Sequence, residues 1–253
     1  MKEFELGEEI YQTIVDGTLK GYLQYLEERR EKKELMNVSG AYAWTKGNHI
    51  DDQVSKIGQE KGLSFTIEKA GYTWEYLQFT LHDQSENYML IVKNSRRLQQ
   101  TFDHDIKKEK NYLVELSDIN IPALKKSGLS FVEHTEQIEL ELTEPEEIKA
   151  VMEGHALNVD QFYSRFYIVT YEIDDDTKLI RSIELMMPNS ETMSLIQVAD
   201  LTKYIDLSPY EVTLEDVAPI QDEEITNQTI FSGAENAFPF SVAAETKEKD
   251  QSN

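Results

Sequence analysis

The chain has 253 residues, of which 40% are hydrophobic, and it contains no cysteine. This length and composition suffice for the core of one large domain or two small ones, and the missing cysteines exclude disulfides, zinc–thiolate sites, iron–sulfur clusters and cysteine nucleophiles. The formal net charge of −23 would repel nucleic-acid backbones, so it argues against direct nucleic-acid binding and favours a basic protein partner.

The first predicted elements are helices. Apolar residues at roughly helical spacing predict one or two helices over residues 5–36, in which Gly17 and Gly21 either weaken the helix or mark close packing. A second amphipathic helix is predicted over residues 48–61, with Asn48 as its N-cap.

Three alternating stretches follow, over residues 63–70, 73–82 and 87–94, and short turns between them predict a β-meander. A helix is predicted to start near Ser95, and the segment after it ends in a loop at Pro122 and Gly128. An acidic strand over residues 134–143 and a capped helix over residues 143–154 come next.

The pattern then predicts a hairpin, whose strands over residues 165–174 and 178–188 meet at a turn around Asp175–Thr177. Residues 190–205 have the spacing of a helix. From about Glu211 the apolar periodicity fades, and the last stretch, AAETKEKDQSN, has the composition of a disordered tail.

These elements predict an α+β fold with N-terminal helices followed by a mainly antiparallel sheet of about six strands, interrupted by helices. Residues 1–125 would hold the helices and the meander. Residues 126–210 would form an acidic subdomain on the same sheet or on a second one, and residues 211–253 an acidic, partly disordered tail.

The negative charge is concentrated late in the chain. Residues 133–176 carry 13 acidic and 2 basic residues, and residues 211–253 carry 10 and 2. Acidic strands are usually just solvated, but they also suit docking on a basic protein or, because carboxylate and phosphate spacings are comparable, mimicry of nucleic acid. The candidate binding residues in these segments are Glu136, Glu139, Glu141, Glu144, Glu146, Glu147, Glu215, Asp216, Asp222, Glu223 and Glu224.

A second candidate site is the stretch AWTKGNHIDDQV, where Trp44, Asn48, Asp51 and Asp52 lie close together in sequence. Carboxylates in the first turn of a helix favour the helix dipole, so a purely structural interpretation also accounts for them. If the domain has a site of its own, these four residues are the first candidates.

No catalytic or metal-binding motif is present. The histidines do not pair at helical spacing, and no phosphate-binding loop or nucleophile elbow occurs, so neither a metal nor a cofactor is predicted. The His82–Asp83 and His104–Asp105 pairs remain without an assigned role. Basic and aromatic residues between Lys93 and Tyr112 resemble single-strand-binding surfaces, but pairing with the chain's own acids is the preferred interpretation.

One hydrolase fold fits the order of elements. Restriction-endonuclease-like folds also place three strands between two helices, as residues 49–102 do, and they need an acid on the second strand and Glu/Asp-x-Lys on the third. The third strand here has Lys93, but Ile91 stands where the acid belongs.

The stretches AWTKGNHIDDQV, YTWEYLQFTLHD and YMLIVKN resemble an uncharacterised family of low-GC Gram-positive bacteria and their phages and mobile elements. The resemblance covers about residues 40–205 and implies a phage or mobile-element setting, where accessory proteins often block or regulate host nucleic-acid machinery. It transfers no mechanism and no catalytic residue.

Together these observations predict a non-enzymatic, acidic interaction protein that inhibits or regulates a nucleic-acid-acting system. The alternative is a divergent metal-dependent nucleic-acid hydrolase or toxin component. A cytoplasmic location is expected, because neither a secretory signal nor a membrane-spanning stretch is visible. The oligomeric state and the identity of the partner are left open.

Overall fold

A computed structural model of the chain describes residues 2–70, 74–83, 86–96, 98–99, 112–129 and 163–222. Residues 1–221 form one unit, and residues 222–253 belong to a second. The predicted strand over residues 134–143 and helix over residues 143–154 lie outside the described residues.

A short 3-10 turn, η1 (Lys2–Phe4), precedes one continuous helix, α1 (Glu8–Leu35). Two glycines of α1 bring it against the next helix, α2 (Lys46–Gln59). A Cβ at Gly17 would lie 2.6 Å from the Cα of Val54, and one at Gly21 would lie 2.5 Å from the Cα of Ile50. Of the two interpretations of these glycines, close packing is therefore the right one.

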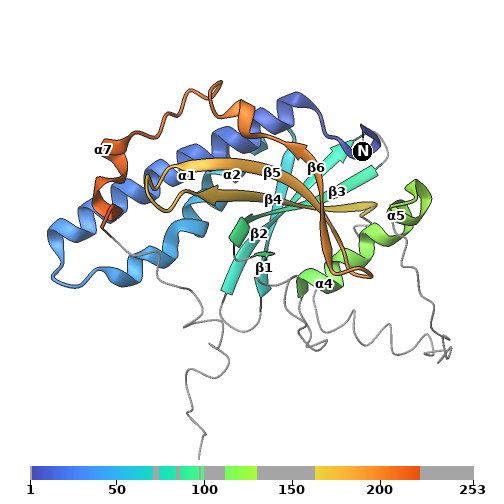
Figure 1. Ribbon diagram of the computed structural model, residues 1–253, viewed down its shortest axis with the longest axis horizontal. Helices are drawn as coiled ribbons and strands as arrows, with labels where there is room; N and C mark the ends of the chain where they lie inside the picture. Colours follow the sequence, from blue (N-terminus) through green and yellow to red (C-terminus); the bar gives the residue numbers. More distant parts are fainter. Residues whose placement is uncertain are drawn as a thin grey trace, which may run out of the picture. The chain divides into compact units, whose positions relative to one another are not determined.

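The six described strands form one sheet in chain order (Figure 1). Neighbouring strands are antiparallel except for β3 and β4, which are parallel. The α+β prediction is confirmed, and the strands on either side of residue 126 share one sheet. Their bounds are β1 Leu63–Ala70, β2 Trp74–Asp83, β3 Glu86–Asn94, β4 Arg165–Ile173, β5 Ile180–Asn189 and β6 Ser194–Asp200.

The β1–β2 hairpin extends beyond its neighbour. The whole of β1 pairs with β2, from Leu63↔Leu81 to Ala70↔Trp74. The ladder between β2 and β3 covers only residues 79–83 of β2, from Phe79↔Leu90 to Asp83↔Glu86. Residues 74–78 of β2 therefore pair with β1 alone, and a fork opens between β2 and β3.

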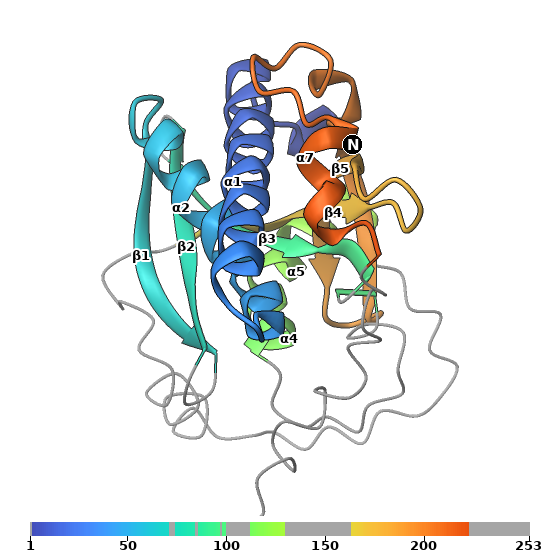
Figure 2. The same ribbon diagram turned by 90° about the vertical axis from the view of Figure 1, so that its left-hand side faces the viewer.

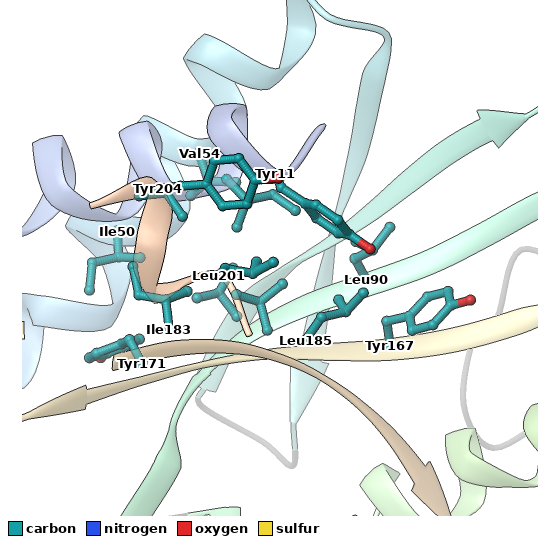
Figure 3. Packing of buried hydrophobic residues seen from close by; sticks show 14 of the residues in the cluster. Tyr11, Ile50, Val54, Leu90, Tyr167, Tyr171, Ile183, Leu185, Leu201 and Tyr204 are labelled. Carbon is teal, nitrogen blue, oxygen red and sulfur yellow. The ribbon is translucent and has the colours of Figure 1, made fainter. Parts of the chain in front are cut away.

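Helices cover both faces of the sheet within this unit (Figures 1 and 2). On one face, α1 and α2 bury the main apolar core, in which Tyr11, Leu90 and Leu185 pack together (Figure 3). On the other face, α4 (Tyr112–Ser117) helps to bury a smaller cluster around Met89 and Phe166.

The prediction of a helix over residues 190–205 is wrong. Residues 194–200 form β6, which pairs with β5, and η4 (Thr202–Tyr204) comes after it. The connecting turn is closed by Asn189, whose Oδ1 accepts hydrogen bonds from the amides of Glu191 and Thr192. Long-range pairing with β5 therefore overrides the helical spacing.

The loop predicted at Pro122 is also wrong. Pro122 lies in the first turn of α5 (Ile121–Ser127), which η3 (Asp118–Asn120) joins to α4, and Gly128 ends α5 in a left-handed conformation. The side chain of Asn120 fixes this segment to the sheet: it donates to the carbonyls of Phe166 and Pro188, both at 2.9 Å, and accepts from the Phe166 amide at 2.8 Å.

Ordered structure continues past Glu211. Thr213 and Asp216 form a capping box at the start of α7 (Leu214–Val217), and η5 (Ala218–Ile220) comes directly after this helix. Val217 and Ile220 are buried in the main core. The first part of the segment predicted as a partly disordered tail, residues 211–253, therefore contains regular structure over residues 214–220.

Candidate functional site

The first predicted site stretch spans η2 (Gly40–Thr45) and the start of α2. Trp44 is partly buried in η2, and Asn48 is exposed. Asn48 is not the N-cap, because α2 begins at Lys46 and Thr45 occupies the cap position without a side-chain capping bond.

Asp51 turns from α2 toward the fork between β2 and β3. Its Oδ2 accepts a hydrogen bond from the backbone amide of Leu77 at 3.2 Å, in the part of β2 that has no β3 partner. Burial raises the pKa of Asp51 to about 6, against the opposing effects of the Lys93 charge and the Leu77 hydrogen bond. The ammonium of Lys93 also lies over the ring of Tyr76, 4.8 Å from its centroid.

Asp52 is placed differently from its neighbour. Its Oδ2 lies 2.7 Å from the Nζ of Lys56, one helical turn later, and its side chain is 47% exposed. An exposed pair of this kind contributes little to stability. The two adjacent acids therefore do not form one site: Asp51 faces the sheet and Asp52 faces solvent.

Sequence reasoning missed a histidine–carboxylate pair in the same region. The Nε2 of His49 lies 2.5 Å from the Oε2 of Glu28 in α1, and the Thr45 hydroxyl donates to the same oxygen at 3.3 Å. The Tyr25 ring packs near the imidazole, with ring centroids 6.4 Å apart. The signal was absent from the local pattern because Glu28 and His49 are 21 positions apart.

The fork does not carry the carboxylates that metal-dependent hydrolysis requires at the predicted strand positions. Ile91 of β3 is fully buried in the smaller apolar cluster. On β2, the buried residues of the same face include Gln78 and Thr80, which both contact the Tyr163 hydroxyl. Among the described residues, no group of three histidine, aspartate or glutamate side chains is placed to hold a metal ion.

Acidic side chains gather on β4, β5 and β6, where the sequence pattern did not single them out. The register aligns Thr170, Glu184 and Asp200 in one row across these strands, and Glu172 lies two residues further along β4. We call Glu172, Glu184 and Asp200 the acidic strand face. Asp200 was missed because it fell in the wrongly predicted helix.

The acidic strand face is only partly neutralised by its neighbours. Burial raises the pKa of Glu184, and the charges of Asp200 and Glu172 raise it further. Hydrogen bonds from Thr202 hold the pKa of Asp200 below its usual value, which keeps that neighbour ionised. Two arginines pair with Glu172, Arg181 at 2.8 Å and Arg96 at 3.7 Å, and the charge of Lys203 also helps to lower the pKa of Asp200.

The acids predicted near the C-terminal end are partly structural. The carboxylate of Asp216 accepts hydrogen bonds from the amide and hydroxyl of Thr213, which hold its pKa below the usual value. Glu215 and Asp222 are exposed. The remaining predicted acids lie outside the described residues: Glu136, Glu139, Glu141, Glu144, Glu146, Glu147, Glu223 and Glu224.

No family model, no curated protein and no solved structure matches the chain. Among the helices in the described ranges, including α1, none has the length and apolar character that a membrane crossing needs. The function is therefore inferred from the geometry and charge of the chain itself.

Proposed function

We propose that this protein is a non-enzymatic interaction protein that docks a basic partner on acidic surface. The observation that carries the proposal is the acidic strand face, in which Glu184 lies among like charges in a chain of net charge −23. Bringing a cation next to such a group relieves the repulsion and lowers the pKa of Glu184, so binding of a basic surface is favoured there.

The acidic segments outside the described residues would extend the same interaction. Residues 133–162 carry nine acidic residues and one lysine, and residues 223–253 carry six acidic and two basic residues. Such an electrostatic field accelerates the encounter with a basic partner, and it makes binding sensitive to salt.

A basic partner in the cytoplasm is most readily a nucleic-acid-binding protein, since phosphate recognition requires lysine and arginine. We therefore propose that the protein inhibits or regulates a nucleic-acid-acting system of the host or of a phage. The resemblance to proteins of low-GC Gram-positive bacteria and their mobile elements supports this setting.

The experiment is affinity capture from host lysate at low and high salt, with the captured proteins identified by mass spectrometry. The double variant Glu184→Gln, Asp200→Asn neutralises two acids and keeps their hydrogen-bond acceptors. Glu34→Gln removes one charge from an exposed position at the end of α1 and serves as the control. We expect a basic protein that the double variant loses and the control retains.

A divergent metal-dependent nucleic-acid hydrolase is a second candidate, favoured by the order of elements. A helix, a three-stranded meander and a crossover to a strand parallel to β3 succeed each other here, and Lys93 lies on β3 at the expected place. Fold order alone does not establish chemistry. Incubation with magnesium or manganese and labelled DNA or RNA tests this candidate, with Asp51→Asn, Asp52→Asn as the comparison.

A further inference from the structure

The two outer strands of the described sheet differ in charge. β1 contains one glutamate and one lysine, so its formal charge is zero, whereas β6 ends at Asp200 in the acidic strand face. Two copies of a chain with net charge −23 repel each other over most of their surface. A neutral strand at the edge is a place where they can meet without that repulsion.

β1 also has the features of a strand that can accept another. In the described sheet it pairs with β2 on one side only, so alternate N–H and C=O groups point away from the sheet. Ile67, near the middle of this eight-residue strand, is 63% exposed. An exposed isoleucine in the middle of an edge strand is an association hazard that proteins usually avoid, unless the strand is covered.

Symmetry restricts how two copies of β1 can pair. Residues directly opposite in an antiparallel pair point to the same face, so a two-fold axis must place one residue opposite its own copy. A two-fold axis at Glu68 would place the carboxylates of the two Glu68 side chains opposite each other. An axis at Ile67 puts two exposed apolar side chains together, sets Thr66 opposite Glu68 and leaves no like-charged pair facing each other.

We propose that the occupant of the β1 edge is β1 of a second copy of this chain, paired antiparallel with Ile67 opposite Ile67. The pairing joins the two sheets into one continuous sheet across the dimer axis. It leaves the acidic strand faces at the opposite edges, so the dimer presents two docking surfaces and binds a repetitive or dimeric basic partner with increased avidity.

The absence of cysteine from the chain makes the register directly testable. A single Ile67→Cys substitution creates one thiol per copy, and two facing positions of an antiparallel pair have the separation that a disulfide needs. We expect full-length Ile67→Cys to form a cross-linked dimer under mild oxidation. Thr66→Cys, one residue away, and Leu207→Cys, a 68% exposed position elsewhere, should remain largely monomeric on denaturing gels.

The association itself is measured by analytical ultracentrifugation of the unmodified chain over a range of concentrations. We expect a dimer that Ile67→Lys dissociates and that Leu207→Lys leaves intact. Both substitutions are at exposed positions, and circular dichroism checks that the fold is kept. A monomer at every concentration, a dimer that survives Ile67→Lys, or cross-linking of Thr66→Cys in preference to Ile67→Cys would each overturn the proposal.

Discussion

The carboxylate of Asp51 in α2 accepts a hydrogen bond from the amide of Leu77 in β2, at 3.2 Å. Leu77 lies in the part of β2 that pairs with β1 alone, so a helix side chain provides the acceptor that a β3 carbonyl would otherwise supply. An ionised carboxylate in this partly buried position is costly, and Lys93 offsets only part of that cost.

Replacing Asp51 with asparagine is expected to change the pH dependence of stability. The pKa of Asp51 is raised from 3.8 to about 6, so between these values the folded state binds a proton that the unfolded state has released. Asp51 therefore lowers stability as the pH rises through this window, by at most about 3 kcal/mol. Asp51→Asn keeps an acceptor for Leu77 and should unfold at higher urea concentration than wild type above pH ~6.

Asp52→Asn is the matched control, because Asp52 is exposed and paired with Lys56. Urea unfolding at several pH values should give the same change of the unfolding free energy with pH for this variant and for wild type. If Asp51→Asn and Asp52→Asn have the same pH dependence as wild type, Asp51 does not have the raised pKa that its burial implies.

The glycines of α1 are expected to tolerate no side chain. A Cβ at Gly21 would lie within 2.5 Å of the Ile50 backbone, so Gly21→Ala must separate α1 from α2 and should cost about 1–3 kcal/mol or more. Gly47→Ala in α2 meets no atom within 4 Å and should leave stability unchanged or raise it by up to about 1 kcal/mol. Thermal unfolding measures the melting temperatures of the two variants. Equal values for Gly21→Ala and Gly47→Ala would contradict the close contact between α1 and α2.

Asn120 is expected to contribute strongly to the stability of the fold. It is fully buried, and its amide makes three hydrogen bonds to the backbones of β4 and β5. Asn120→Ala leaves these backbone groups without a partner and should cost about 3 kcal/mol or more. Asn48→Ala, at an exposed helical position, should change little. Chemical denaturation measures the unfolding free energies of both variants. A loss below about 1 kcal/mol for Asn120→Ala would mean that water replaces the side-chain amide.

Local sequence patterns predicted much of the fold. The alternation in residues 63–94 places the three strands of the meander within a residue or two, although residues 89–92 of β3 are buried on both faces of the sheet. The local patterns gave the wrong element at β6, where pairing with β5 decides the structure. They also gave the wrong N-cap at Asn48, because α2 begins two residues earlier, at Lys46.

The candidate site was predictable only in part. Asp51 was identified from its sequence neighbours, but its role depends on Leu77 and Lys93, which only the folded sheet brings near. The pair of Glu28 and His49 and the acidic strand face combine residues from separate elements, so no local spacing indicates them.

The hydrolase alternative predicts the opposite effects of the same substitutions. The described fork has isoleucine at position 91, so we expect no magnesium- or manganese-dependent cleavage of DNA or RNA. Metal-dependent cleavage that Asp51→Asn, Asp52→Asn removes, and that charge reversal across residues 133–147 spares, would establish the alternative. Preparations of both variants made in parallel control for a contaminating nuclease.

The most direct test of acidic docking is the salt-dependent capture of a partner by wild type and by Glu184→Gln, Asp200→Asn. We predict a single basic protein that wild type retains at low salt and loses at high salt. The double variant and charge reversal across residues 133–147 should both weaken its capture, while Glu34→Gln should not. No captured protein at either salt, or a partner whose binding is indifferent to salt and to these substitutions, would contradict the account.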